Sequence, residues 1–532
     1  MKIWSYIFMN NWITDAIFYH IYPLGFCGAT LENNENQPVN RIEKVIEWIP
    51  HLKELGINAI YFGPVFDSLT HGYDTSDYTK IDNRLGSNSD FKKVSDELHK
   101  NGIKVVLDGV FNHVGRGFWA FKDVQQNGQG SRYCSWFSGI DFSRQSPMGD
   151  AFNYNSWEGH PALVKLNLQN QEVCEHLLSA VGGWIDEFDV DGIRLDAADC
   201  VDMNFFRQLV DFTKNKKKDF WLMAEIIHGD YTRWANPNLL NSVTNYECYK
   251  GNWSSHNDKN YFEIAHSLNR QFGKGGVYSN IFCYNFVDNH DVIRLASIIK
   301  NKNHLQNVYT LMFTMPGIPS IYYGSEWAIT GDKSNCDQNL RPCLDLNNIP
   351  NADFELENHI KKLARIRTKL VAFKSTNYEQ VIVRNEQFVF KRENENKSVY
   401  VALNLADAPY TVEFPCTSTT LVDLLSGEKI PVSNNKATVQ IAPFSSMILS
   451  DGVAETIETV PQESTKESVL ETIKLGKYRH FKGNEYEVIA IAKHSETLEE
   501  MVVYKALYGE GEVWVRPAKM WLDPPTRFEF LG

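Results

Sequence analysis

An alternation that repeats eight times between Ala16 and about Leu370 constrains the fold most strongly: a short apolar run, then a segment with helical periodicity. Short runs rich in branched and aromatic residues are typical of buried strands. Strands that alternate with helices pair in parallel through right-handed crossovers. Eight repeats over about 355 residues predict a (β/α)8 TIM barrel. A doubly wound sheet is the alternative, but it usually has fewer strands and a Gly-rich phosphate turn, which we do not find.

Apolar runs and flanking glycines place the individual elements. The predicted barrel strands are Ala16–Tyr22, Ala59–Phe62, Lys104–Asp108, Gly192–Leu195, Phe220–Ala224, Ser242–Asn245, Ile281–Val287 and Ile321–Tyr323. The predicted helices are Ile42–Leu55, Asp90–Lys100, Glu172–Glu187, Val201–Lys218, Asp258–Phe272, His304–Met315 and Phe354–Leu370. About fifty-five residues after the third strand lack periodicity, which is typical of a functional insertion or a small subdomain.

Changes in texture divide the chain into domains. Residues 1–370 form the predicted barrel, with an insertion after strand 3 at residues 111–165. Residues 371–451 alternate strand-like runs with turn residues, which predicts a C-terminal antiparallel β-sandwich. Residues 452–475 are acidic and poor in aromatics, as expected of a linker. Residues 476–532 return to strand-like patterning and form a small additional β-rich domain, so the predicted class is α/β with two appended β domains.

Charge and cysteine usage narrow the class of partner. A net charge of −13 disfavours nucleic acid and anionic membranes as partners and suits a neutral substrate. Nine cysteines without a close pair indicate reduced thiols in the cytoplasm rather than a disulfide framework. The N-terminal MKIWSYIFMNNW lacks a long apolar region and a cleavage site, so we do not expect a signal peptide. No apolar run reaches the length of a membrane span.

Two predicted strands end abruptly in a carboxylate, Asp196 after GIRL and Glu225 after FWLMA. Burying a carboxylate costs several kcal/mol unless it is paired or hydrogen-bonded, so a strand that ends in one usually ends at a site. Because parallel strands end on the same edge, we expect both acids on one rim. The alternative is a structural Arg–Asp pair beside an unrelated glutamate, and these two acids alone leave both interpretations open.

The neighbours of the two acids predict different charge states. Arg194 lies two residues before Asp196 on the same strand face, so it should lower the pKa of Asp196. Met223 takes the equivalent place before Glu225, so we expect nothing local to support that charge. One anionic carboxylate and one protonated acid on a shared rim are the pair of groups that cleaves a glycosidic bond.

Five short motifs at matching places carry a family resemblance. They are DGVFNH at 108–113, VKLN at 164–167, GIRLD at 192–196, AEIIH at 224–228 and DNHD at 288–291. Each alone is a weak signal, but in this order and spacing the chain resembles the α-amylase family, glycoside hydrolase family 13, over about residues 12–450. The residue pattern downstream of the AEIIH motif is similar to that of neopullulanases, cyclomaltodextrinases and oligo-1,6-glucosidases.

The resemblance implies a role for each matching residue. Asp196 resembles the nucleophile, Glu225 the general acid and base, and Asp291 the third carboxylate that fixes the distorted sugar. The residues that the resemblance assigns to substrate binding or to support of the site are Arg194, His113, His290, Tyr73, His71, Asp108, Asp337 and Arg341. Retention of anomeric configuration is implied, with the two reacting carboxyl groups roughly 5–5.5 Å apart.

Departures from the family pattern concern metal binding and assembly. Val164 stands where similar motifs usually have proline, and Asp199-Cys200 replaces a Lys-His pair associated with calcium and acceptor binding. Asn112 matches one calcium ligand position, so calcium stays an alternative to our expectation that no cofactor is required. The N-terminal β-domain of many neopullulanases has no counterpart before about residue 14, and we expect a monomer or a weak homodimer.

Aromatic residues outside the motifs have two interpretations. Trp136 and Trp157 are candidates for sugar stacking, and core packing is the alternative. The last domain resembles a small bacterial domain family of unassigned function. Its Tyr478, His480, Tyr504 and Trp514 are candidates for ligand contact, with a small aromatic core as the favoured alternative.

The expected function is hydrolysis of α-1,4 glucosidic bonds in maltooligosaccharides or related α-glucans, with α-1,6 bonds as a further candidate linkage. The same chemistry with a sugar or phosphate acceptor would make a transglycosylase or phosphorylase, and the sequence does not separate these. A non-catalytic carbohydrate-binding barrel is a further alternative. It is disfavoured because inactive members of the family have lost a carboxylate, and Asp196, Glu225 and Asp291 are all present.

Overall fold

The computed structural model describes residues 12–334, 336–451, 473–480, 483–493, 500–509, 511–518, 521 and 528–531. The chain divides into two compact units, Met1–Glu455 and Thr456–Gly532, which are described separately. Most of the predicted linker and the first eleven residues lie outside the described ranges. Within those ranges, no helix is long and apolar enough to cross a membrane.

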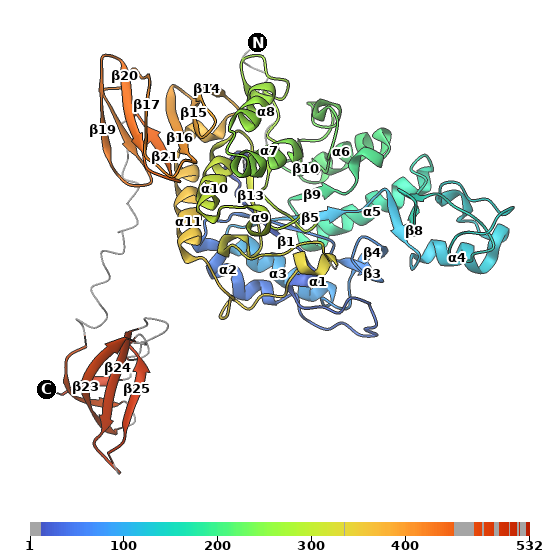
Figure 1. The fold of residues 1–532 in the computed structure, drawn as a ribbon. Coiled ribbons are helices and arrows are strands. Elements are labelled where there is room, and N and C mark those ends of the chain that lie inside the picture. Colours follow the sequence, from blue (N-terminus) through green and yellow to red (C-terminus); the bar gives the residue numbers. More distant parts are fainter. Residues whose placement is uncertain are drawn as a thin grey trace. The chain divides into compact units, whose positions relative to one another are not determined.

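Eight parallel strands form the centre of the first unit (Figure 1). They are β1 (Phe18–Ile21), β2 (Ala59–Phe62), β5 (Lys104–Gly109), β9 (Gly192–Leu195), β10 (Trp221–Ala224), β11 (Ser242–Val243), β12 (Tyr284–Asn285) and β13 (Ile318–Tyr322). Their order is β11-β10-β9-β5-β2-β1-β13-β12. A parallel bridge between Thr244 and Tyr284 joins the two ends, so the sheet closes. The predicted barrel is confirmed and the doubly wound alternative is excluded.

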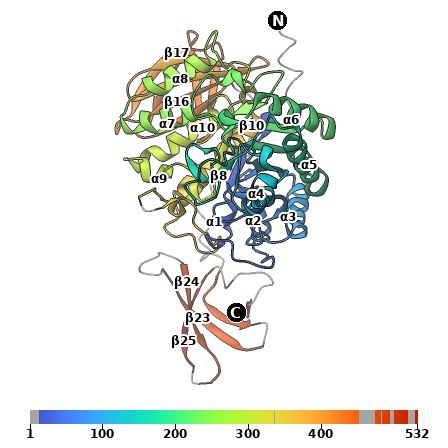
Figure 2. The same ribbon diagram turned by 90° about the vertical axis from the view of Figure 1, so that its right-hand side faces the viewer.

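Helices surround the barrel, with α3, α5 and α6 on one side and α7, α8 and α10 on the other (Figure 2). The main helices are α2 (Lys44–Glu54), α3 (Asn88–Lys100), α5 (Gln171–Phe188), α6 (Met203–Lys216), α7 (Tyr246–Asn257), α8 (Phe262–Phe272), α10 (Leu305–Thr314) and α11 (Phe354–Lys369); α1 (Pro23–Phe26) and α9 (Leu295–Ile298) are single turns. The sequence did not predict α7, because its buried face includes the polar residues Asn252, Ser255 and His256 and so lacks an apolar stripe.

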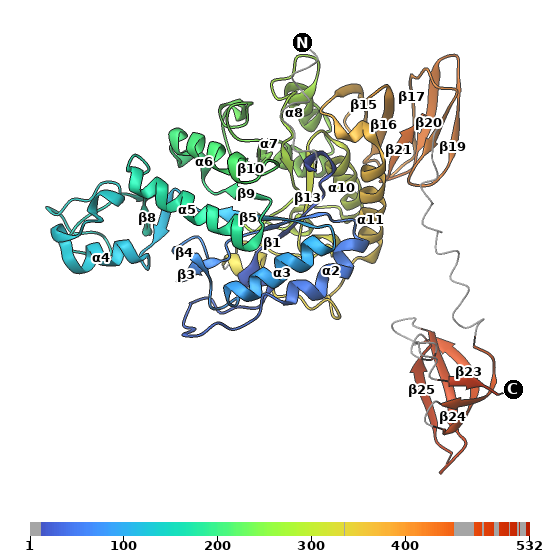
Figure 3. The ribbon, with the colours of Figure 1, turned by 180° about the vertical axis from the view of Figure 1, so that it is seen from behind.

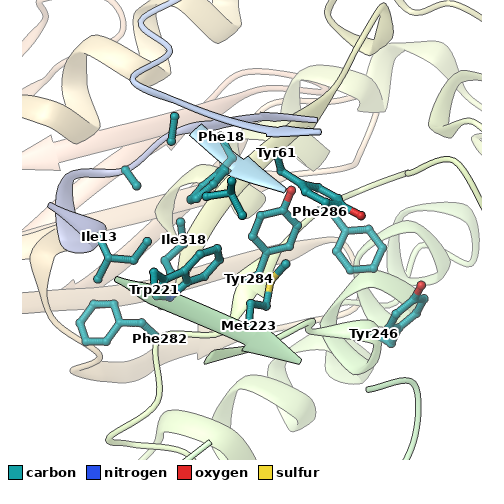
Figure 4. Packing of buried hydrophobic residues seen from close by; sticks show 13 residues of the cluster. Ile13, Phe18, Tyr61, Trp221, Met223, Tyr246, Phe282, Tyr284, Phe286 and Ile318 are labelled. Atoms are coloured by element: carbon teal, nitrogen blue, oxygen red, sulfur yellow. The ribbon is translucent and has the colours of Figure 1, made fainter. Parts of the chain in front are cut away.

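Aromatic and branched side chains fill the barrel (Figure 4). Phe18 from β1 lies 5.2 Å from the ring of Trp221 and 5.4 Å from that of Tyr284. Such tilted and edge-on pairs add about 0.5–1.5 kcal/mol each beyond the area they bury. This packed interior supports the strand ends, where Tyr61 and Tyr246 from the same cluster reach the rim with their hydroxyl groups.

The insertion after β5 has regular structure that the sequence did not reveal. It contains α4 (Trp119–Asn127) and a three-stranded sheet of β6 (His113–Gly115), β8 (His160–Lys165) and β7 (Ser156–Trp157). A separate hairpin of β3 (Phe66–Ser68) and β4 (Thr75–Ile81) follows β2. Both lie after barrel strands on the rim that carries the acids, and the hairpin loop brings Tyr73 there.

An antiparallel β-sandwich lies beside α10 and α11 (Figures 1 and 3). Its strands are β14 (Tyr378–Val383), β15 (Gln387–Asn394), β16 (Lys397–Asn404), β17 (Tyr410–Pro415), β18 (Thr420–Asp423), β19 (Lys429–Ser433), β20 (Lys436–Ile441) and β21 (Ser446–Ser450). The predicted sandwich is confirmed, with β19 as an additional strand. Asn307 and Thr310 of α10 hydrogen-bond Asn404 and Ser446, which fastens it to the barrel.

The second unit is an antiparallel sheet with its own aromatic core. Its strands are β22 (Gly476–His480), β23 (Glu485–Lys493), β24 (Glu500–Ala506), β25 (Val513–Pro517) and β26 (Phe528–Phe530), in the order β25-β24-β23-β22-β26. Tyr478 and Tyr504 are buried with Trp521, so they are core residues rather than exposed ligand contacts. Trp514 is 52% exposed. Ile473, inside the stretch predicted as linker, also packs in this core.

Candidate active site

The ends of neighbouring strands bring three carboxyl groups to one place. Asp108 lies near the end of β5, Asp196 directly follows β9 and Glu225 directly follows β10. These strands are adjacent and parallel in the order β10-β9-β5. Asp108 and Asp196 are buried, and the Glu225 side chain is 11% exposed. The predicted shared rim is therefore present.

Arg194 joins all three carboxyl groups. Its Nη1 lies 2.8 Å from Asp196 Oδ1 and 3.0 Å from Asp108 Oδ1, and its Nη2 lies 2.7 Å from Glu225 Oε1. A single planar guanidinium thus spans the gap between Asp196 and Glu225. The prediction that nothing local supports a charge on Glu225 is wrong, because Arg194 pairs across strands with Met223 and so reaches the neighbouring acid.

Burial and crowding of negative charge dominate the titration of Asp196. Burial raises the pKa of Asp196 well above its usual range; Arg194 opposes this rise, and the charges of Glu225 and Asp108 add to it. The predicted net lowering by Arg194 is wrong because it omitted burial and the other two acids. One guanidinium does not neutralise three carboxylates, so the negative charge of Asp196 is disfavoured despite its contact with Arg194.

The backbone after Asp196 adds a further donor. Ala197 has a φ of 42°, a left-handed conformation that residues with a Cβ adopt only at a cost. Its N–H donates to Glu225 Oε2 over 3.2 Å. The turn that ends β9 therefore links the backbone beside one acid to the side chain of the other.

A second group of charges surrounds Asp291, after β12. Its Oδ2 lies 2.9 Å from His290 Nε2, and its Oδ1 lies 3.1 Å from Arg341 Nη2. Partial burial raises the pKa of Asp291, but the neighbouring His290 and Arg341 outweigh this and hold it below its usual range. Asp337 is 3.6 Å from Arg341 and half exposed. The predicted Asp337–Arg341 pair is thus present, and Arg341 is also a direct neighbour of Asp291.

Tyr73 connects the two groups. Its hydroxyl donates to Asp108 Oδ2 over 3.0 Å and lies 2.5 Å from His290 Nε2. Its ring stacks on that of His290 at 5.5 Å, and His71 Nδ1 accepts from the Tyr73 N–H. Tyr61, which the sequence did not single out, also donates to Asp108 Oδ2, over 2.6 Å. Asp108 therefore contacts Arg194, Tyr73 and Tyr61.

His113 and Asn112 lie at the base of the insertion. His113 is buried, which lowers its pKa to about 4, with the charge of His71 as a second cause. Its ring lies 5.6 Å from Trp157, which in turn stacks on His160. Trp136 is buried, and its indole N–H donates to Glu172 Oε2, so core packing rather than sugar stacking describes this residue.

The calcium alternative depends on Asn112, the residue that matches a calcium ligand position. The buried Oδ1 of Asn112 has no hydrogen-bond partner among the described residues. However, no group of three acidic, histidine or cysteine side chains that could hold a metal gathers in the described part of the chain, whereas calcium takes six to eight oxygen ligands. We therefore derive no step through a metal.

Tyr246 and Asn289 are neighbours of the acids that the sequence interpretation missed. The Tyr246 hydroxyl lies 3.3 Å from Glu225 Oε1, and Asn289 Nδ2 lies 3.2 Å from the Tyr246 oxygen. Tyr246 follows β11 by three residues and Asn289 lies inside DNHD. The rule that found the acids, polar groups at strand ends, would have selected both.

Comparison with known proteins agrees with this geometry. Residues 21–368 match the family model described as "Alpha amylase, catalytic domain". The chain belongs to the α-amylase family. Residues 378–448 match "Maltogenic Amylase, C-terminal domain" and residues 476–527 match "Protein of unknown function (DUF1653)". As an α-amylase family glycoside hydrolase, the chain places its acids where the barrel strands end.

Relatives of this α-amylase family member cover most of its length. It is 31% identical over 454 residues to a maltogenic alpha-amylase of Bacillus acidopullulyticus, covering 80% of this chain and 76% of that protein. It is 29% identical over 484 residues to neopullulanase 2 of Thermoactinomyces vulgaris, covering 83% and 78%. Among solved structures, a cyclomaltodextrinase matches with a TM-score of 0.74 at 27% identity, covering 83% of this chain and 79% of that chain.

Proposed function

We propose that the protein hydrolyses α-1,4-glucosidic bonds, and α-1,6 bonds in related substrates, in maltooligosaccharides by double displacement with retention. The observation that carries this proposal is Asp196 and Glu225 held by one guanidinium at adjacent strand ends. Support comes from relatives named maltogenic alpha-amylase, cyclomaltodextrinase and neopullulanase, and from a similar structure titled cyclic alpha-maltosyl-(1→6)-maltose hydrolase of Arthrobacter globiformis, with a TM-score of 0.70 at 26% identity over 84% of this chain and all of that one.

The first half-reaction breaks the glycosidic bond. An Asp196 oxygen attacks the anomeric carbon while Glu225 gives its proton to the glycosidic oxygen, which leaves with the bonding electron pair as an alcohol. The step requires the proton to be on Glu225 and Asp196 to be ionised beside Arg194. The product is a glycosyl ester on Asp196, and the positive charge that develops on the sugar lies beside the negative charge of Asp196.

The second half-reaction releases the sugar. Glu225, now a carboxylate, takes a proton from water as the water oxygen attacks the anomeric carbon. The bond between the sugar and Asp196 breaks, and the bonding electrons return to the Asp196 carboxylate. Arg194 forms an ion pair with this carboxylate. Glu225 is protonated again, so the cycle closes with one water consumed. We propose that it needs no cofactor, because two carboxyl groups and water complete both steps.

The remaining predicted residues suit recognition of the reacting sugar. Asp291 is held ionised and is 37% exposed, so it can accept hydrogen bonds from sugar hydroxyls. His290 lies beside it, with Nε2 2.9 Å from Asp291 Oδ2, while His113 offers a ring donor and Tyr73 an aromatic face.

We propose a cytoplasmic monomer or weak homodimer. All nine cysteines are free, and relatives include an intracellular maltogenic amylase of Bacillus subtilis, 30% identical over 63% of this chain and 58% of that protein. Reduced thiols are normal in the cytoplasm.

Glu225→Gln tests the assigned acid. The amide keeps the shape but has no proton to donate, so hydrolysis of maltotriose should fall by about 10²–10⁴-fold. Formation of the glycosyl-enzyme from α-maltosyl fluoride should fall much less, because fluoride departs without protonation. The readout is sugar and fluoride release under initial-rate conditions.

Added azide separates this proposal from a structural role for Glu225. Azide needs no general base, so it should speed turnover of the fluoride by Glu225→Gln and yield α-maltosyl azide. Equal losses on both substrates, or a β-configured azide product, would contradict the assignment.

A further inference from the structure

The two oxygens of Glu225 have different environments. Oε1 forms an ion pair with Arg194 Nη2 at 2.7 Å and accepts a hydrogen bond from Tyr246 Oη at 3.3 Å. Oε2 accepts from one, the Ala197 N–H at 3.2 Å. A carboxylate has about two acceptor positions per oxygen. Oε1 therefore faces a cation and a hydroxyl donor, whereas Oε2 faces a single N–H, so a proton on this carboxyl group is accommodated better on Oε2.

A chain of hydrogen bonds fixes the direction of the tyrosine hydroxyl. Asn289 Oδ1 accepts from the Asp291 N–H over 2.8 Å, so its amide NH2 faces the other way. That NH2 lies 3.2 Å from the Tyr246 oxygen and can only donate. The single hydroxyl proton of Tyr246 is then directed to Glu225 Oε1.

The fold holds Tyr246 tightly in this position. Asn245 is fully buried, caps α7 by accepting from the Cys248 N–H, and donates to Asn285 and Gln271. The Tyr246 ring packs edge-on against Phe286 at 5.0 Å. The first turn of α7 is thus fixed to β12, and the hydroxyl is pre-organised against the acid.

We propose that Tyr246, oriented by Asn289, is a positioning residue that reserves Oε1 of Glu225 and so assigns the transferable proton to Oε2. This inference rests on the proposed function of Glu225 and goes beyond it by naming the donating oxygen and the group that selects it. The same chain connects the backbone of Asp291 to the acid, so the group that binds sugar and the group that gives the proton share one hydrogen-bonded frame.

Tyr246→Phe tests the inference, because it removes one oxygen and keeps the ring. A hydroxyl that donates to a carboxylate favours the charged form, so its loss makes Glu225 keep its proton to higher pH. The alkaline limb of the kcat/KM profile for maltotriose should move up by about half to one pH unit, and the rate at the optimum should fall by about 10-fold, since Oε1 becomes available to the proton. The loss with α-maltosyl fluoride should be smaller.

Tyr249→Phe is the matched control, one turn further along α7. The Tyr249 ring stacks on Phe286, and the same atom is removed. It should leave the pH profile and both rates within a factor of two of wild type, with melting temperatures of all variants compared. An unmoved alkaline limb in Tyr246→Phe, or equal losses on the two substrates, would overturn the inference while leaving the proposed function intact. A wild-type protein that hydrolyses neither substrate, at any pH, would overturn both.

Discussion

Asp196→Asn should abolish hydrolysis of maltooligosaccharides, lowering kcat by about 10⁴-fold or more, because an amide oxygen does not form the glycosyl ester. It should not unfold the protein. Burial and two neighbouring carboxylates disfavour the charge on Asp196, so a neutral isostere relieves repulsion, and the melting temperature should be unchanged or higher. Initial rates on maltotriose and a thermal melt at pH 7 measure the two effects.

Asp211→Asn provides the matched control for this loss. Asp211 is exposed on α6, so the same chemical change should leave both kcat and the melting temperature near their wild-type values. If Asp196→Asn kept more than one part in a hundred of the wild-type rate, Asp196 would not be the nucleophile.

Arg194→Met should have the largest effect on stability. It leaves Asp108, Asp196 and Glu225 without the cation that all three contact. Removing one partner of a buried ion pair costs about 3–5 kcal/mol, which corresponds to a fall of roughly 4–6 °C in melting temperature for a domain of this size. The deficit should be largest near pH 8 and shrink towards pH 5, because the uncompensated carboxylates take up protons more readily as the pH falls.

Arg194→Lys distinguishes charge from shape. An ammonium restores one positive charge but lacks the planar fork that reaches two acids at once. It should recover most of the melting temperature and little of the activity. A lysine variant with near wild-type turnover would contradict the bridging role of Arg194, as would an Arg194→Met deficit that does not vary with pH.

The barrel and the places of its acids could be predicted from the sequence because both follow from short-range patterns. Apolar runs between helical segments gave all eight strands, and Asp196 and Glu225 directly follow two of them. The environment of Glu225 could not be predicted in the same way. Arg194 reaches Glu225 from the neighbouring strand, because the register of the two strands pairs Arg194 with Met223. The sequence of either strand alone does not specify this register.

Buried polar side chains explain why helix α7 was not predicted from the sequence. Helix α7 has buried serine, asparagine and histidine side chains, so periodicity of apolar residues did not reveal it, and Tyr246 at its first turn was missed with it. In the second unit, the favoured interpretation of Tyr478 and Tyr504 as members of a small aromatic core is confirmed, because both pack on Trp521. An aromatic core of this kind is typical of a small domain that must bury much area with few residues.

The central claim is that Asp196 and Glu225 perform the two halves of one displacement, as nucleophile and as acid. Its most direct test is to treat Glu225→Gln with a slow, fluorinated α-glucosyl fluoride and to locate the adduct by peptide mass mapping. The account predicts a single glycosyl group on the peptide that contains Asp196, absent in Asp196→Asn. A glycosyl group on any other carboxylate, or turnover of the reagent with inversion of configuration, would contradict it.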